Sequence, residues 1–394
     1  MKSSRPSRDP AFRRFWAAAL ISATLVSTAC TAAPSTTGSS TASASASASA
    51  AASTVPADLA DAWKFMQQQM PGVPLSVLEA AKAEGSLMLY AGTWTKAQND
   101  LNAGFEKVFP FIKVQEYTAS TGQRDARWLA EEKAGRHVAD VIQETDVGTF
   151  KDFVSKGLIA KYKISNAADY DPDVSVADYG YPLRVGMVGI AWNTNLVSAD
   201  DAKVLSSWKG IADPRWKGRA AIVDPSAGGV AYLPWYAWTK QYGDGFIGQV
   251  AANKPRVFPA TNPASAALAS GDVAVIFNAS ETGLLPLQEK GAPIRWSLPS
   301  PGVGPPTLQA ISATAPHPNA ARLFQEYSFT KRGYPLWQKA GGAPARLNYQ
   351  DERPIAKESW YKMPSKMFSY EPAAATAAQD HIIQLVHQEI GKAG

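Results

Sequence analysis

Small and polar residues stand at the ends of several short apolar segments, where they could bind a small solute. Their hydroxyl, amide and carboxylate groups form hydrogen bonds, and free N–H groups at helix starts attract anions. The candidate ligand-binding residues are Gly92, Thr93, Trp94, Ser120, Thr121, Gln123, Arg124, Thr145, Asp146, Arg184, Ser226, Ala227, Gly228, Gly229, Tyr232, Asn278, Ser280 and Glu281. Plain helix capping explains any single one of these loops equally well.

The stretch AAIVDPSAGG (220–229) shows the pattern most clearly. Its four apolar residues are typical of a short buried strand, and Asp224-Pro225-Ser226 ends that strand. Gly228 and Gly229 then keep the following corner free of side chains. Such a corner is either a tight turn or a place where a polar or anionic ligand approaches the backbone N–H groups.

Motifs for nucleophilic or nucleotide chemistry are missing. Gly302-Val303-Gly304 begins like a dinucleotide-binding loop, but two prolines follow, which cannot donate N–H groups. Ser206 and Lys209 match S-x-x-K without the partner motifs S-D-N and K-T-G. We therefore predict no catalytic residue. The alternative is a secreted enzyme that uses Asp146 or Glu281 as a base.

The histidines offer no metal-binding pattern. They are His137, His317, His381 and His387. No two of them lie three or four positions apart, so no helical pair can hold zinc. The sequence predicts neither a metal site nor a cofactor.

The first 29 residues have the pattern of an export signal. A basic start ending in Arg13-Arg14 precedes an apolar run over 15–26, which is too short for a stable membrane span, and small residues follow. We predict a signal peptide over 1–29. Whether export uses the general secretory route or the twin-arginine route suggested by Arg13-Arg14 stays open.

Cys30 is the only cysteine, so an internal disulfide is excluded. Its place directly after the apolar run favours lipid attachment. Residues 31–55 are rich in Ala, Ser and Thr and cannot build a core. We therefore predict a lipidated Cys and a flexible tether over 30–55, which would anchor the protein at the outer face of the cytoplasmic membrane, in the periplasm or at the cell surface.

The net charge argues against a nucleic-acid partner. The chain carries a formal +5, but the leader holds five basic residues and one acidic residue, which leaves the remainder at only +1. No dense Lys/Arg stripe follows, as nucleic-acid binding would need.

After the tether, short apolar strands alternate with helical segments. The expected strands cover 86–90, 112–117, 139–143, 185–192, 220–223, 273–277 and 308–312. Such alternation predicts α/β sheets with helices on their faces. We expect two lobes joined by a two-segment hinge near 181–185 and 299–305. Residues 56–182 plus 303–394 would form the discontinuous first lobe, and residues 183–302 the second.

Several segments together resemble the iron(III)-type solute-binding proteins of bacterial ABC transporters. These segments are 130–142, 182–197, 207–229, 267–277, 315–327 and 342–348. The resemblance implies a two-lobed type 2 periplasmic-binding-protein fold with mixed sheets flanked by helices. It also implies a monomer that captures a small-molecule ligand between its lobes and delivers it to a permease with its ATPase. The resemblance also implies that Ser226 and the N–H groups of Ala227 to Gly229 face the ligand.

The same resemblance bears on the ligand. Ferric members of the family bind iron through two adjacent tyrosines after the strand that matches 273–277, and here these positions read Asn278-Ala279-Ser280-Glu281. We therefore expect an organic or phosphorylated anion, or chelated iron. Arg124, Arg184 and Arg346 are possible counter-charges. A ferric-iron-binding protein with non-tyrosine ligands is the alternative.

Overall fold

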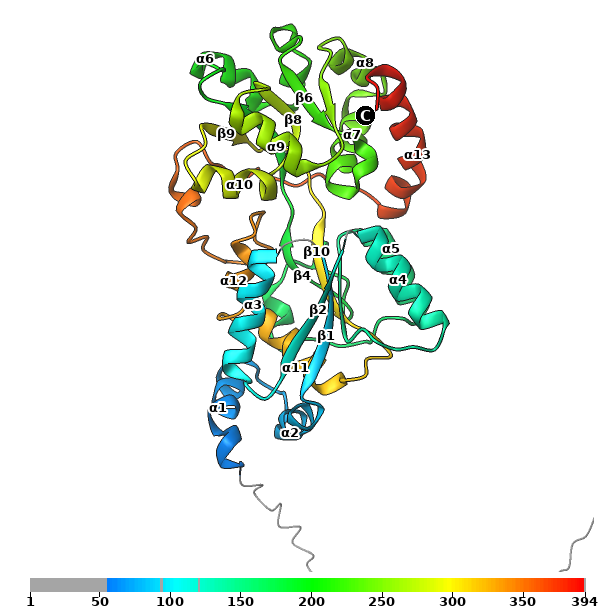
Figure 1. Cartoon of the computed structure of the whole chain (residues 1–394), viewed down its shortest axis with the longest axis vertical. Helices are drawn as coiled ribbons and strands as arrows, with labels where there is room; N and C mark the ends of the chain where they lie inside the picture. Colours follow the sequence, from blue (N-terminus) through cyan, green and yellow to red (C-terminus); the bar gives the residue numbers. More distant parts are fainter. Residues whose placement is uncertain (1–54, 93–94, 120, 393–394) are drawn as a thin grey trace, which may run out of the picture. The chain divides into compact units, whose positions relative to one another are not determined.

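The computed structural model describes residues 55–92, 95–119 and 121–392. The predicted signal peptide, Cys30 and the tether up to residue 54 lie outside these ranges. Residues from Thr54 onward pack as one unit that contains two five-stranded sheets (Figure 1). Within the described ranges, every helix is too short or too polar to cross a membrane.

The first sheet is mixed. Its strands in spatial order are β2 (Lys113–Thr118), β1 (Ser86–Ala91), β3 (Val141–Glu144), β10 (Pro306–Ile311) and β4 (Tyr181–Val185). β1 runs parallel to β2 and β3, whereas β10 runs antiparallel to β3 and β4. The accompanying helices are α1 (Ala60–Gln69), α2 (Leu75–Glu84), α3 (Thr95–Val108), α4 (Thr121–Lys133), α5 (Val147–Ser155), α11 (Pro318–Ser328) and α12 (Tyr334–Gln338).

Both faces of the first sheet are covered. Leu89 and Val141 belong to an apolar cluster with residues of α2, α3 and α11, whereas their neighbours Tyr90 and Ile142 pack with Trp128 of α4. Successive residues of a strand point to opposite faces, so a sheet buried on both sides needs consecutive apolar residues. This requirement explains why these strands are apolar runs.

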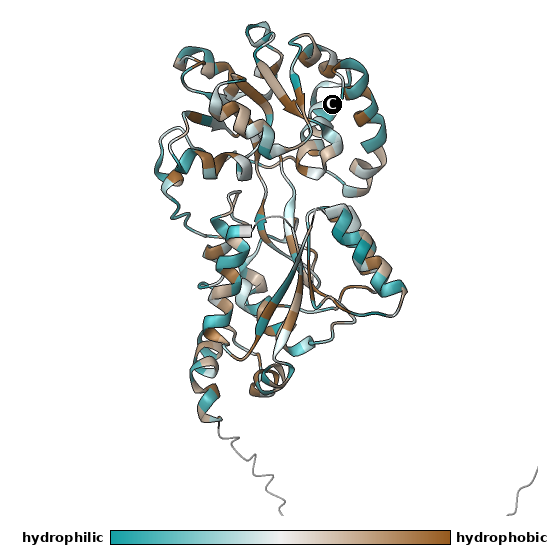
Figure 2. Ribbon diagram, in the orientation of Figure 1, coloured by the Kyte–Doolittle hydropathy of each residue, from teal (hydrophilic) through white to brown (hydrophobic). Residues whose placement is uncertain are grey.

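The second sheet is mixed as well, which confirms the predicted α/β fold with mixed sheets flanked by helices. Its strands are β7 (Arg256–Phe258), β6 (Ala220–Val223), β8 (Val275–Ser280), β5 (Val188–Asn193) and β9 (Ile294–Ser297). β6 is parallel to β7 and β8, and β5 is antiparallel to β8 and β9. The helices are α6 (Ala199–Ala202), α7 (Gly229–Tyr242), α8 (Gly245–Ala251), α9 (Thr261–Ser270) and α10 (Glu281–Glu289). Figure 2 shows apolar residues along these strands.

The single strand expected over 185–192 is wrong. The chain leaves the first sheet after β4, passes through Gly186 and Met187, and enters the second sheet as β5. The return segment runs beside it, because Gly186 N–H donates to Pro305 O (2.8 Å). A Cβ on Gly304 would lie 1.5 Å from Gly186 O, so only glycine allows the two backbones to approach this closely.

The assignment of 303–394 to the first lobe is also wrong for its C-terminal part. The last helix, α13 (Pro372–Glu389), packs against α7 and α8 of the second sheet. Ala375, Ile382 and Val386 are buried in the same apolar cluster as Trp235. Their spacing predicts one apolar helix face but says nothing about which sheet covers it.

Candidate functional site

A small cavity, partly open to solvent, lies where elements of both sheets meet the C-terminal segment. From the first sheet it is lined by Thr145, Asp146 and Val147. From α7 and the return segment it is lined by Gly229, Tyr232, Leu233 and Pro305. The C-terminal segment contributes Tyr370, Pro372, Ala375, Thr376 and Gln379.

Four of the residues expected to bind ligand line this cavity: Thr145, Asp146, Gly229 and Tyr232. They come from strand ends of two different sheets, so the fold brings distant loops together as the strand-end argument requires. Tyr232 is held in place because its hydroxyl donates to Ala375 O of α13 (2.6 Å).

Three helices begin at the cavity, through Val147 of α5, Gly229 of α7 and Pro372 of α13. Asp146 caps α5 by accepting a hydrogen bond from Thr149 N–H (2.6 Å), and Glu371 caps α13. The start of α7 has no side-chain cap. Its first N–H groups are therefore the part of the cavity best suited to an anion.

The two glycines at the start of α7 have different reasons to be glycine. Gly228 has φ 125°, a backbone conformation that other residues rarely adopt. Gly229 has space around it, because an added Cβ would meet no atom within 4 Å. The Gly229 position thus leaves room beside the uncapped helix start.

Buried charged side chains hold the loop between β3 and α5 in place. Glu144 accepts hydrogen bonds from the N–H groups of Thr145 (2.6 Å) and Asp146 (2.7 Å). Its other carboxylate oxygen pairs with Arg124 Nη2 (2.5 Å), and both side chains are fully buried. Burial raises the pKa of Glu144 to about 8, while the positive charge of Arg124 acts in the opposite direction. Arg124 thus holds the loop and does not line the cavity.

Thr121, at the start of α4, reaches the same loop. Its Oγ1 lies 3.3 Å from Thr145 Oγ1. The neighbouring candidate Gln123 is exposed, and Gly92 is a buried residue at the end of β1. Thr93, Trp94 and Ser120 lie outside the described residues.

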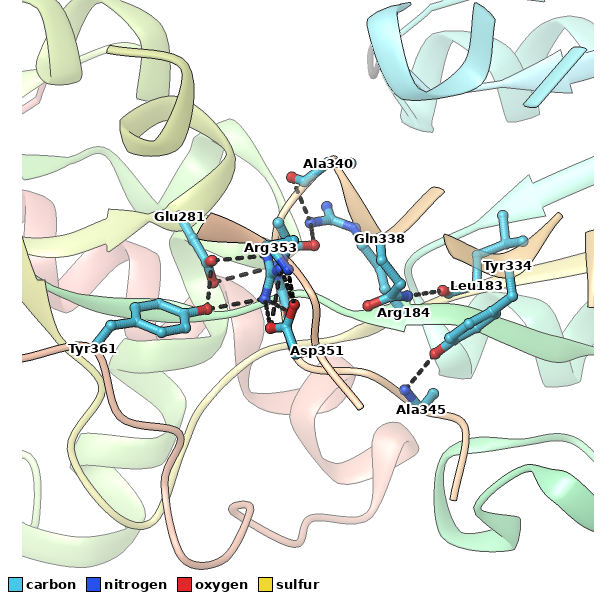
Figure 3. Close-up of polar contacts among 12 residues, drawn as sticks. Leu183, Arg184, Glu281, Tyr334, Gln338, Ala340, Ala345, Asp351, Arg353 and Tyr361 are labelled. Atoms are coloured by element: carbon cyan, nitrogen blue, oxygen red, sulfur yellow. Dashed lines mark hydrogen bonds and ion pairs between the residues drawn. The ribbon is translucent and has the colours of Figure 1, made fainter. Parts of the chain in front are cut away.

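Glu281 belongs to a separate buried cluster, drawn in Figure 3. Its Oε1 accepts hydrogen bonds from Tyr361 Oη (2.7 Å) and Arg353 Nη1 (3.2 Å), and its Oε2 accepts one from Gly342 N–H (3.1 Å). Arg353 also pairs with Asp351 (2.6 Å). The carboxylate is 1 % exposed. These contacts leave Glu281 no exposed edge for a ligand.

Arg184 lies close to this cluster and is also directed inward (Figure 3). Its Nη1 donates to Gly341 O (2.7 Å) and Ala340 O (3.3 Å). Burial lowers the pKa of this guanidinium to about 10. The third possible counter-charge, Arg346, pairs with Asp169 (2.6 Å). The structure places neither arginine at the cavity.

The remaining candidates from the second sheet stabilise backbone. Asn278 bridges β6 and β8, because its side chain accepts from Val223 N–H (2.8 Å) and donates to Val223 O (2.8 Å). Ser280 Oγ lies 2.8 Å from Thr282 Oγ1. Ser226 donates through its N–H and Oγ to Asp224. These residues and Ala227 do not line the cavity.

Sequence reasoning missed the contribution of the C-terminal segment. Tyr370, Thr376 and Gln379 line the cavity although they follow no strand. Burial, with the nearby negative charge of Asp146, raises the pKa of Tyr370 to about 12, so its hydroxyl is a hydrogen-bond donor. The signal present in the sequence is Glu371-Pro372, an acidic cap followed by proline at the first helical position.

The donor set is a poor one for a bare metal ion. Asp146 is the one carboxylate among the residues that line the cavity, and burial raises the pKa of the two tyrosines there, Tyr232 and Tyr370, which disfavours their phenolate forms. Across the described part of the chain, no three His, Cys, Asp or Glu side chains gather to hold a metal. The resemblance places the adjacent tyrosines of ferric family members in the segment Asn278-Ala279-Ser280-Glu281. Here Asn278 bridges two strands and Glu281 is buried.

Comparison with known proteins agrees with this architecture. Residues 87–341, well over half of the chain, match the family model described as bacterial extracellular solute-binding protein. An uncharacterized protein of Haemophilus influenzae is 23% identical over 334 residues, which cover 80% of this chain and 94% of that protein.

Solved structures share the fold. Iron-bound HitA from Pseudomonas aeruginosa superposes with a TM-score of 0.63 at 18% identity, covering 77% of this chain and 99% of HitA. AfuA from Actinobacillus pleuropneumoniae, with fructose-6-phosphate bound, gives 0.61 at 20% identity, covering 78% of this chain and 99% of AfuA. The IdiA (FutA) protein of Trichodesmium, in complex with iron and citrate, gives 0.61 at 16% identity, covering 78% of this chain and 100% of that one. These likenesses confirm the type 2 periplasmic-binding-protein fold.

Proposed function

Because the chain belongs to the family of bacterial extracellular solute-binding proteins, we propose that it captures a small organic anion and delivers it to an ABC permease. The cavity between Asp146 and Gly229 is the site. The observation that carries this assignment is the uncapped start of α7 in a cavity whose other walls carry hydroxyl, amide and carboxylate groups. The protein binds its solute and does not transform it.

Two parts of the cavity lining favour different ligand groups. N–H groups at the start of α7 attract a phosphate or carboxylate. Asp146 repels such a group and accepts hydrogen bonds from ligand hydroxyls. A hydroxylated organic anion, of which a sugar phosphate is one example, suits both. AfuA, which shares the fold, has fructose-6-phosphate bound, and this supports the choice of probe.

Bare ferric iron fits the cavity less well. Its hard trivalent charge needs several anionic oxygen donors, and Asp146 is the one carboxylate at the site. Iron held by an organic acid would present the acid's own anionic groups to α7. Chelated iron therefore stays within the proposed ligand class, as an organic anion that carries a metal.

Capture would follow population shift between open and closed arrangements of the two sheets. A ligand that touches both the β3–α5 loop and α7 gains all its contacts only when these elements are close, so binding stabilises that arrangement. Export through residues 1–29 and lipid attachment at Cys30 would keep the protein near its permease as a monomer. A Cys30→Ser variant should leave the membrane fraction and appear in the soluble fraction.

A thermal-shift and calorimetry panel tests the ligand class. Fructose 6-phosphate, inorganic phosphate, ferric citrate and ferric chloride are compared on the wild-type protein. An organic anion should stabilise folding by mass action, about 2.7 kcal/mol at a hundredfold excess over Kd. Stabilisation by ferric chloride alone would favour the ferric alternative, and turnover of a bound compound would favour an enzyme.

A matched pair of variants tests the location. Gly229→Val adds a side chain at the start of α7, on a residue that lines the cavity and has space around it. Gly245→Val makes the same change at the start of α8, which also has space but does not line the cavity. Only Gly229→Val should abolish binding. Equal binding by the two variants would place the ligand elsewhere.

A further inference from the structure

The C-terminal helix lies outside the part of the chain that matches the family model, which ends at residue 341. Nevertheless Tyr370, Thr376 and Gln379 form one side of the cavity. We propose that this segment is the specificity wall of the ligand site, with Gln379 contacting the anionic end of the solute and Tyr370 its hydroxylated end. This inference rests on the proposed function.

The arrangement of α13 supports these two roles. Ala375 and Gln379 are four residues apart and share a helix face. Tyr232 of α7 donates to the carbonyl of Ala375 (2.6 Å), so this face is turned toward α7 and its uncapped start. Gln379 lines the cavity and can offer an amide N–H₂ group to an anion without adding negative charge.

Tyr370 lines the same cavity as Asp146. Burial and the negative charge of Asp146 raise the pKa of Tyr370, so the phenol stays protonated. Together they offer a donor and an acceptor, which is the pair that recognises a ligand hydroxyl. Phe368 stacks on the Tyr370 ring (centroids 6.0 Å apart, planes 11°) and fixes its plane.

Contacts with the rest of the protein hold the specificity wall rigidly enough to discriminate between ligands. α13 is tied to α7 through Tyr232, and its far end is tied to the Asp224 corner by His387 Nε2 (2.9 Å). Its first turn also touches α5, because a Cβ on Gly148 would lie 3.1 Å from Thr376 Oγ1 and 3.7 Å from Pro372 Cβ. Binding groups held by packing and hydrogen bonds discriminate better than groups on free loops.

Calorimetry on the full chain tests the wall, with fructose 6-phosphate and inorganic phosphate as probes. Gln379→Ala should weaken binding of both probes roughly tenfold, the effect of losing one hydrogen bond to a charged group. Tyr370→Phe keeps the stacked ring and should weaken only fructose 6-phosphate, so selectivity over inorganic phosphate falls. Gln384→Ala, on an exposed position of the same helix, is the control and should change neither.

The outcomes separate the wall from the site itself. If Gly229→Val abolishes binding while Gln379→Ala and Tyr370→Phe bind like the wild type, the proposed function stands and the specificity wall is overturned. If the wild type binds neither probe, both the ligand class and the wall are overturned. If Gln384→Ala weakens binding as much as Gln379→Ala, the effect comes from the helix as a whole, which also overturns the wall.

Discussion

The hydroxyl of Tyr232 in α7 donates a hydrogen bond to the backbone carbonyl of Ala375 in α13, over 2.6 Å. Both residues line the cavity and both are buried. This contact connects a helix inside the family-matched region to one that follows it. Loss of the bond should therefore affect both folding stability and the shape of the site.

Tyr232→Phe removes that hydroxyl, whereas the Ala375 carbonyl keeps its hydrogen bond within α13. We expect a loss of about 0.5–1.5 kcal/mol in the free energy of unfolding, measured by urea denaturation. The control is Tyr242→Phe, because Tyr242 is only half-buried and its ring, not its hydroxyl, makes the recorded contacts. Equal losses in the two variants would mean that the Tyr232 hydrogen bond contributes nothing particular.

Substitutions of the two glycines at the start of α7, Gly228 and Gly229, should have separate effects on folding stability and on ligand binding. Gly228→Ala forces a side chain onto a backbone with φ 125° and should cost about 1–3 kcal/mol of stability. Gly229→Ala adds a methyl group in open space and should leave stability nearly unchanged. Because Gly229 lines the cavity, the added methyl group should weaken ligand binding. The reverse pattern, with Gly229→Ala the less stable variant, would contradict the backbone conformation described for Gly228 and Gly229.

The raised pKa of Glu144 should make folding stability depend on pH. Its pKa is raised by burial from 4.5 to about 8 in the folded protein. Between these values the folded state holds a proton that the unfolded chain has lost, so the stability that Glu144 contributes is present in full below pH 4.5 and is lost as pH rises through about 8. Urea midpoints at about pH 6 and about pH 9 measure the fall. Glu144→Gln should flatten it, and an equally steep fall in that variant would assign the effect to other groups.

The Glu281–Arg353 pair predicts a strongly coupled double-mutant cycle. Arg353→Met leaves the Glu281 carboxylate buried without its cation and should cost about 3–5 kcal/mol. Arg353→Met combined with Glu281→Gln should cost less than the sum of the single changes. Arg215→Met, which breaks an exposed pair with Asp213, is the control and should have little effect. Additive losses would show that the buried pair is not coupled.

Much of the fold was predictable because strands and helices have local signals. The segment 220–223 coincides with β6, and 86–90 and 112–117 fall within one residue of β1 and β2. The sequence could not show that 185–192 contains the end of one strand and most of another, because the apolar run continues where the chain passes from the first sheet to the second. The destination of α13 depends on tertiary packing, which a helix's apolar face alone does not specify.

The candidate site was predictable only in part, for a related reason. Strand ends and bare corners pointed to Thr145, Asp146, Gly229 and Tyr232, which do meet at the cavity. Glu281 looked equally suitable, but its partners Arg353 and Tyr361 lie 72 and 80 positions away in the sequence. Whether a polar side chain faces a ligand or its own protein is decided by such distant partners.

The most direct test of the central claim is a crystal structure of the protein with fructose 6-phosphate, or with the tightest-binding compound of the panel. We predict that the anionic group lies at the start of α7 beside Gly229 and that ligand hydroxyls face Asp146 and Tyr370. A ligand bound at the Glu281 cluster, or on a surface away from the cavity, would contradict the account.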